Sequence, residues 1–233
     1  MMLSQFQLGM ARLLTTVVSP APFLPRILKL RFDRSKLGTV DSLVEFIHTR
    51  SSYIAQTSLH GYLKARMGTS FRAWFEDEVF SASIRIASVK VFLSCLSDLT
   101  VYSVATAARQ TVFDDTTLQA LAGHAFRKAA LAGLAGQPER DDLDATFEAF
   151  DRRTCLENWQ AAAEGRRAFS GSEADLVRYA PVIDEYRELD QEIVTNSIRF
   201  RWRDVREQIR RRMDGHGLLE DWKAGAGRGE AGC

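Results

Sequence analysis

Apolar residues recur at helical spacing along most of the chain. Between residues 43 and 63 they return every three or four positions, which predicts an amphipathic helix. Thr39 suits its N-cap, Asp41 its first turn, and Met67-Gly68 its end. No stretch of useful length alternates apolar and polar residues with the period of a strand, and there is no Asn-Gly hairpin turn or internal repeat. We therefore predict an all-α protein.

The longest predicted helix runs from Val79 to Arg109 without Gly or Pro, for about 46 Å at 1.5 Å per residue. Its part from Ile86 to Ala108 holds only Lys90 and Asp98 as charges and is long enough to cross a bilayer. Insertion is disfavoured because central charges cost about 2.5–3.5 kcal/mol each in lipid and many hydroxyl side chains interrupt the segment. We expect this helix at the centre of a helical bundle.

Capping signals divide the chain after this helix. Asp114 suits an N-cap, with Phe113 before it and Leu118 four positions inside, which is the hydrophobic-staple pattern. The helix that begins there is expected to end near Gly133. Another helical region covers residues 141–165. These signals predict two further elements of the bundle.

The last third of the chain predicts a short helix and then a long one. Ser170 and Glu173 have the S-x-x-E spacing of a capping box, and Pro181 suits the first turn of a helix that extends to about Met213. Glycine and alanine dominate after residue 214, which is typical of a flexible tail. The apolar stripe of the long helix drifts along its length and comprises Val182, Tyr186, Leu189, Ile193, Ile198, Trp202, Val205 and Ile209.

Together these elements predict an irregular bundle of about six helices with two long central helices. We expect three regions, which are a basic amphipathic N-terminal arm (1–36), a helical domain (37–214) and a flexible Gly/Ala-rich tail (215–233). The chain carries 31 Lys+Arg against 30 Asp+Glu, so it lacks the global basic charge of a dedicated nucleic-acid binder. Arginine greatly outnumbers lysine, which is typical of a GC-rich, bacterial coding sequence.

The arm differs from the rest of the chain in charge. It holds one acid, Asp33, so its net charge is about +5, whereas the remainder is about −4. Apolar residues at helical spacing predict a short helix over residues 2–18, which Pro20, Pro22 and Pro25 end. Its basic residues are Arg12, Arg26, Lys29, Arg31, Arg34 and Lys36.

Four interpretations of the arm compete. A secretory signal is disfavoured because Arg12 interrupts the apolar stretch, and a transit peptide does not fit a bacterial sequence. The arm also suits packing on the body of the same protein. We favour an interfacial role, in which the apolar stripe enters a membrane surface and the basic residues lie near anionic head groups.

Candidate chemistry is sparse. A di-metal bundle needs two Glu-x-x-His pairs, and only Glu45 and His48 have that spacing. The acids Glu76-Asp77-Glu78 are explained by the positive end of the helix that follows. No nucleophile elbow, phosphate-binding glycine loop or C-x-x-C pair occurs. We therefore predict no catalytic residue, metal or cofactor.

A second basic patch lies at the end of the last long helix. Phe200 and Trp202 lie among its arginines and suit base stacking, although the balanced total charge makes nucleic acid an unlikely partner. Lipid phosphates and an acidic protein partner are equally compatible with this patch, and we expect several of its arginines to pair with the acids of neighbouring helices. Its members are Arg199, Arg201, Arg203, Arg206, Arg210, Arg211 and Arg212.

These features favour a non-enzymatic adaptor, assembly or regulatory protein. We expect it in the cytoplasm, peripherally on the inner face of the membrane, with a protein partner, and its oligomeric state stays open. One alternative is a helical-bundle enzyme with a small apolar pocket for a lipid-like or ester substrate, in which His48 or His60 acts as base and Asp98 contributes. A second alternative is a regulator that binds nucleic acid through residues 199–212.

Overall fold

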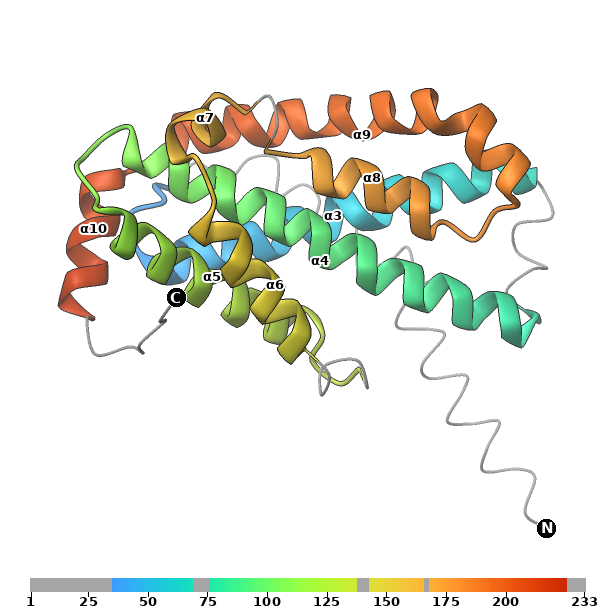
Figure 1. Cartoon of the computed structure of the whole chain (residues 1–233), viewed down its shortest axis with the longest axis horizontal. Coiled ribbons are helices and arrows are strands. Elements are labelled where there is room, and N and C mark those ends of the chain that lie inside the picture. The colour runs from blue at the N-terminus through green and yellow to red at the C-terminus, as the bar shows by residue number, and fades with distance from the viewer. Residues whose placement is uncertain (1–34, 69–75, 138–142, 166–167, 226–233) are drawn as a thin grey trace, which may run out of the picture. The chain divides into compact units, whose positions relative to one another are not determined.

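The computed structural model describes residues 35–68, 76–137, 143–165 and 168–225, and these residues form an all-α fold (Figure 1). By packing, the chain divides into two units, Met1–Ser35 and Lys36–Cys233, and every helix named here belongs to the second. The predicted arm lies outside the described residues except for its last two. The described helices are α3 (Val40–Met67), α4 (Glu78–Ala108), α5 (Asp115–Gly133), α6 (Asp144–Cys155), α7 (Trp159–Glu164), α8 (Ser170–Tyr179), α9 (Asp184–Arg212) and α10 (Gly215–Ala224).

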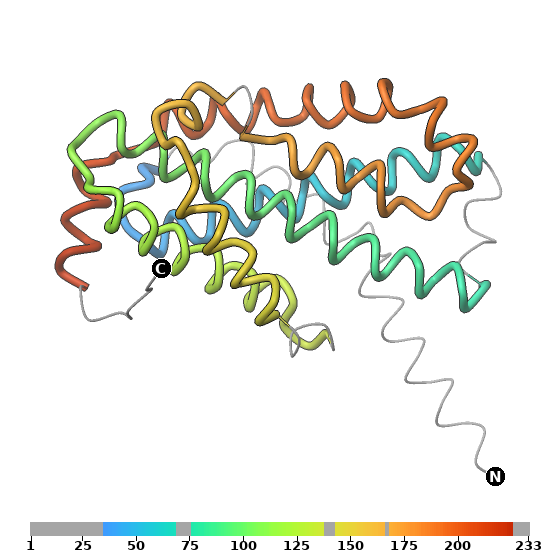
Figure 2. Tube along the Cα trace, viewed as in Figure 1, coloured from blue at the N-terminus to red at the C-terminus, as the bar shows by residue number. Residues whose placement is uncertain are grey.

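The predicted bundle is therefore confirmed, with more helices than expected. The region predicted over 141–165 contains two helices, α6 and α7, because Asn158 caps a second helix by accepting a hydrogen bond from the Ala161 amide at 2.9 Å. Three helices are long rather than two, since α3 spans 28 residues beside the 31 of α4 and the 29 of α9. Figure 2 shows these three running lengthwise through the second unit.

Helix α4 is the central element, as its composition predicts. It packs against α3, α5, α7 and α8, and buries residues on all its sides. Among the described helices it alone is long and apolar enough to cross a membrane, by length and composition only. A core helix passes the same test, so this finding is weak evidence for a membrane span.

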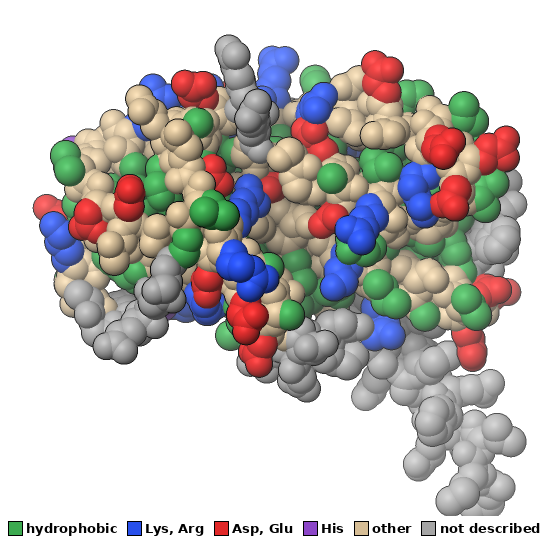
Figure 3. All heavy atoms as spheres, viewed as in Figure 1, with side chains coloured by type: hydrophobic (Ala, Val, Ile, Leu, Met, Phe, Trp, Pro, Cys, Tyr) green, Lys and Arg blue, Asp and Glu red, His purple; other side chains and the backbone are tan. Residues whose placement is uncertain are grey.

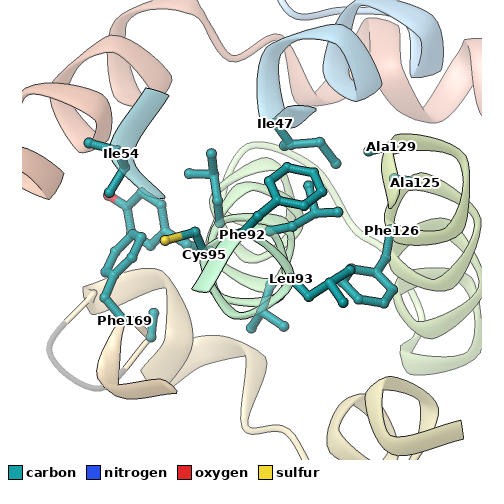
Figure 4. Packing of buried hydrophobic residues seen from close by; sticks show 14 of the residues in the cluster. Ile47, Ile54, Phe92, Leu93, Cys95, Ala125, Phe126, Ala129 and Phe169 are labelled. Carbon is teal, nitrogen blue, oxygen red and sulfur yellow. The ribbon is translucent and has the colours of Figure 1, made fainter. Parts of the chain in front are cut away.

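The apolar core surrounds α4. Figure 4 shows Phe92, Leu93 and Cys95 on α4. Ile47 and Ile54 reach this cluster from α3 (Figure 4). The remaining labelled members are Ala125, Phe126 and Ala129 of α5, and Phe169, which precedes α8 (Figure 4).

Three predicted helix starts are confirmed by their caps. The Thr39 side chain accepts a hydrogen bond from the Ser42 amide at 3.2 Å, and the Ser42 hydroxyl accepts one from the Thr39 amide. Asp77, from the acidic triplet, caps α4 by accepting from the Phe80 amide at 2.8 Å. Asp114 caps α5 in the same way. Each cap satisfies amides that have no partner inside the helix.

Two predictions at helix starts are wrong, although both helices are present, and α8 has the predicted span from Ser170 to Tyr179. The capping box of Ser170 and Glu173 is absent, since Phe169 occupies the N-cap of α8 and provides no side-chain cap. Pro181 lies outside α9, whose N-cap is Ile183 and whose first residue is Asp184. Local spacing failed at α8 because its amides are satisfied by a residue from another helix, which is described below.

The expected tail is also partly wrong, because residues 215–224 form α10. Asp214 caps this helix by accepting a hydrogen bond from the Gly217 amide at 3.0 Å, and Leu218 is buried. The Asp221 carboxylate accepts a hydrogen bond from the Val40 amide at 2.9 Å, which joins α10 to the start of α3. Asp214 is a residue type that suits an N-cap, but the high glycine content of the residues that follow it favoured the prediction of a flexible tail.

Candidate functional site

The polar centre of the described bundle is the carboxylate of Asp98, on α4, which is 0% exposed. Arg153 of α6 donates from Nη1 to Asp98 Oδ1 at 2.8 Å, and the Ser172 amide donates to Oδ2 at 2.6 Å. Burial raises the pKa of Asp98 to about 6, against the lowering effects of Arg153 and Ser172. Loss of hydration therefore outweighs both partners in setting this pKa.

Asp98 acts as a cap for α8. Ser172 lies in the first turn of that helix, where amides have no partner within the helix, and Phe169 does not supply one. A Cβ atom on Gly171 would lie 2.9 Å from Asp98 Oδ1, so only glycine allows the carboxylate to approach this closely. The capping function that sequence spacing assigned to Ser170 and Glu173 thus belongs to a carboxylate more than seventy residues away.

Further hydrogen bonds extend from Asp98 to other helices. Arg153 also donates to the Ser97 hydroxyl at 2.7 Å and to the Ala168 carbonyl at 3.3 Å. Trp202 of α9 donates from Nε1 to the Ser172 hydroxyl at 3.1 Å. This network joins α4, α6, α8 and α9, so its first physical consequence is the alignment of these helices.

A buried thiol lies one turn before Asp98. Burial raises the pKa of Cys95 well above its usual value, and the charges of Asp98 and Asp175 act in the same direction. The Ser94 hydroxyl donates to Asp175, which fixes that carboxylate against α4. A protonated, buried thiol is a poor nucleophile, so Cys95 serves packing.

The two histidines of the enzyme hypothesis are placed on α3. The ring of His48 lies edge-on to Phe92, with centroids 6.2 Å apart. Burial lowers the pKa of His60. The hydrogen bonds of the Asp98 carboxylate go to Arg153 and Ser172 rather than to either histidine. Within the described ranges, no group of three or more His, Cys, Asp or Glu is arranged to hold a metal ion.

Several arginines of the predicted basic patch contact other elements of the bundle. Arg199 pairs with Glu173 of α8 at 2.7 Å. Arg206 donates to the Gly165 carbonyl at 3.4 Å, and Arg210 donates from Nε to the Tyr102 hydroxyl at 3.0 Å. The guanidinium of Arg212 lies over the Phe46 ring at 5.1 Å. These contacts give four of the seven arginines a structural function.

The other members of the patch and its aromatic residues differ in exposure. Arg203 pairs within α9 with Glu207 at 3.9 Å, Arg201 is half-buried and Arg211 is exposed. The expectation that Trp202 suits base stacking is wrong, because this side chain is buried against Phe169 and α8. Phe200 is exposed. On the face shown in Figure 3, acidic and basic side chains are interspersed.

The predicted membrane-binding residues of the arm lie mostly outside the described part of the chain. The residues that lie outside it are Arg12, Arg26, Lys29, Arg31 and Arg34. Lys36 is described, and its Nζ atom lies 3.6 Å from Asp214 Oδ2, at the N-cap of α10. Its neighbour Leu37 is buried and its amide donates to the Arg212 carbonyl at 2.8 Å. Residues 36 and 37 therefore belong to the packed body.

No family model matches the chain, and neither does any of the curated proteins or solved structures compared with it. The fold itself defines the class, which is an all-α helical bundle. One of its two described buried aspartates, Asp98, serves as a cap between helices.

Proposed function

We propose that this protein is a non-enzymatic helical adaptor that attaches peripherally to an anionic membrane surface through its arm and presents its bundle to a protein partner. The observation that carries the proposal is the charge division, with about +5 on residues 1–36 and about −4 on the remainder. The body alone is repelled on average by an anionic surface, so attraction must come from the arm.

The expected strength of attachment follows from two contributions. Each cation near an anionic surface contributes about 1 kcal/mol, and the apolar stripe predicted over residues 2–18 adds burial in the interface. Six cations are enough for reversible binding whose electrostatic part weakens as salt rises. This combination is typical of a peripheral protein rather than of a spanning one.

The non-enzymatic part of the proposal is supported by the Asp98 network. The carboxylate with the raised pKa, which is the kind of group expected in an active site, has both oxygens engaged by Arg153 and Ser172. Its geometry is accounted for by helix capping. We therefore assign the function to surfaces of the protein.

Flotation with lipid vesicles tests the proposal. Full-length protein and a variant that lacks residues 1–34 are mixed with vesicles of phosphatidylcholine alone or with added phosphatidylserine. This deletion keeps Lys36 and Leu37, which contact the body of the protein. We expect only the full-length protein to float, only with anionic vesicles, and less at high salt. Equal recovery of both proteins would refute a function for the arm.

A matched charge control separates the arm from the α9 arginines. R31Q/R34Q removes two charges from the arm, whereas R203Q/R211Q removes two charges from exposed positions on α9. We expect the first variant to weaken flotation and the second to leave it unchanged. If instead R203Q/R211Q alone weakens flotation, and retention on a polyanion column survives the arm deletion, the basic patch on α9 is the anion-binding surface.

A further inference from the structure

One side of α9 carries a row of exposed apolar side chains. Tyr186, Leu189, Ile193 and Phe200 are 41%, 68%, 70% and 69% exposed. At about 100° per residue these four lie within about 60° of one another around the helix. The buried residues of α9 lie on a different side and are Val194, Ile198, Trp202, Val205 and Ile209. We call the exposed row the α9 seam.

The seam is accessible along the described part of the molecule. Helix α9 packs against α8, α3 and α4 mainly through its other side (Figure 1), and only Tyr186, at the edge of the seam, is contacted from α3, where the Arg66 guanidinium lies over its ring at 4.7 Å. Apolar residues spaced by three, four and seven positions are the pattern of a helix that pairs with another helix. Isolated exposed apolar residues need no explanation, but four on one strip of one helix do.

Charges beside the seam change sign along the helix. Residues 184–197 hold five acids and one arginine, whereas residues 198–212 hold seven arginines and two acids. Glu185 and Glu192 lie on one flank of the seam, and Arg199 and Arg203 continue the same flank, about 80–120° from Ile193. The helix dipole favours this order only within the first and last turns. It does not account for Glu192, Arg199 and Arg203.

We propose that the α9 seam binds the α9 seam of a second copy of this chain in an antiparallel, two-fold arrangement. A two-fold axis perpendicular to the helices keeps the charged flank of both copies on the same side and reverses one helix relative to the other. The acidic half of each α9 then faces the basic half of the other. In a parallel pair, like charges would lie level with each other.

The same register of the two helices pairs the opposite charges and the apolar residues of the seam. A two-fold axis near Asn196 brings Glu192 level with Arg199 of the second copy, and Ile193 level with its Phe200, to within about one residue rise. Arg199 is already held by Glu173 at 2.7 Å and is still 60% exposed, so its position costs little further entropy. Asn196 is exposed at the centre of the row, where a polar side chain favours one register over others.

Sedimentation velocity of the full chain over a range of concentrations, without lipid, tests the proposal. We expect a reversible monomer–dimer equilibrium. I193D should weaken dimerisation about a hundredfold or more, because two buried isoleucines are lost and two carboxylates lose hydration. V112D introduces the same residue at an apolar position that is 91% exposed and far from α9 in sequence, and should leave the equilibrium unchanged. Circular dichroism confirms that each variant is folded.

The orientation is tested by a matched pair of charge reversals. E192R places four cations in a row beside the seam and should weaken an antiparallel dimer about tenfold. E220R makes the same change at an exposed position on α10, outside the proposed interface, and should have little effect. A parallel pair would keep residue 192 level with itself, so E192R would leave its strength unchanged; unchanged or stronger dimerisation of E192R would therefore overturn the proposal.

Two further outcomes would also overturn it. The first is a wild-type protein that stays monomeric at every concentration. The second is a monomeric protein whose vesicle binding is lost in I193D, because the seam would then meet lipid. The proposal is independent of the arm, so the variant without residues 1–34 should dimerise as the full chain does.

Discussion

Asp98 gives the protein a pH-dependent stability whose sign is unusual for an aspartate. Its folded pKa is about 6, whereas its reference value is 3.8. The folded protein therefore holds this proton more tightly than the unfolded chain does. The stabilisation is fully present below the unfolded value and is lost as pH rises through the folded value. Most paired aspartates behave in the opposite way.

The magnitude follows from the shift of about two pH units. Each unit corresponds to about 1.4 kcal/mol, so Asp98 contributes roughly 3 kcal/mol well below pH 4, and its contribution falls by roughly 2 kcal/mol between pH 4 and pH 7. The loss is concentrated between the two pKa values and stops above the folded one. The physical cause is the hydration that the ionised carboxylate lacks beside Arg153 and Ser172.

Urea unfolding of the wild type and D98N between pH 4 and pH 7.5 measures this contribution. Asparagine does not ionise, so the difference in unfolding free energy between the two proteins cancels the other titrating groups. We expect wild type minus D98N to fall by roughly 2 kcal/mol over this range. D98N keeps an oxygen that accepts a hydrogen bond from Ser172 or Arg153, which favours retention of the fold.

D114N provides a control of opposite sign. Hydrogen bonds from Thr117 lower the pKa of Asp114, so its contribution is present above the unfolded value and is lost as pH falls below it. Wild type minus D114N should therefore decrease only on acidification. A wild type minus D98N difference that is flat, or that rises with pH, would show that Arg153 and Ser172 outweigh burial and would refute the reasoning.

Three further variants test the packing, two of them, G215A and D221A, where α10 joins the rest of the bundle. G215A should lower the free energy of unfolding by about 1–3 kcal/mol, because its Cβ would lie 2.5 Å from the Ala107 carbonyl oxygen. G61A should raise the free energy of unfolding by roughly 0.5–1 kcal/mol, because the new Cβ would have only an ordinary contact at 3.6 Å in the interior of α3. Thermal unfolding that gives the two variants the same stability would contradict this packing. D221A removes the acceptor of the Val40 amide and should cost about 1 kcal/mol. Hydrogen exchange should then be faster in α10 and at the start of α3, and unchanged exchange there would contradict the contact.

The sequence predicts the helices of this fold well where the determining interactions are local. Thr39, Asp77 and Asp114 cap helices through amides three residues away, so their spacing is visible in the sequence. At α8 the same reasoning fails, because Asp98 supplies the cap from another helix. A carboxylate inside an apolar helix was the available signal, but only the fold identifies its partners.

The apolar stripe of α9 shows a second limit of sequence reasoning. The predicted stripe combines residues of two sides, since Tyr186, Leu189 and Ile193 are exposed whereas Trp202 and Val205 are buried. The apolar positions shift around the helix along its length because α9 has two apolar sides, one buried and one exposed. Periodicity counts apolar residues but does not show which of them a neighbour covers. The exposed seam is defined by the packing of α3, α4 and α8, which cover the other side of α9.

The central claim is that α4 is a helix of the bundle rather than a membrane span, and that the proposed attachment to lipid depends on the arm. Alkaline carbonate extraction of membranes that carry the full-length protein tests this claim most directly. We expect the protein in the supernatant, because α4 packs against α3, α5, α7 and α8. Retention in the pellet with lipid would show that α4 spans the bilayer and would contradict the claim.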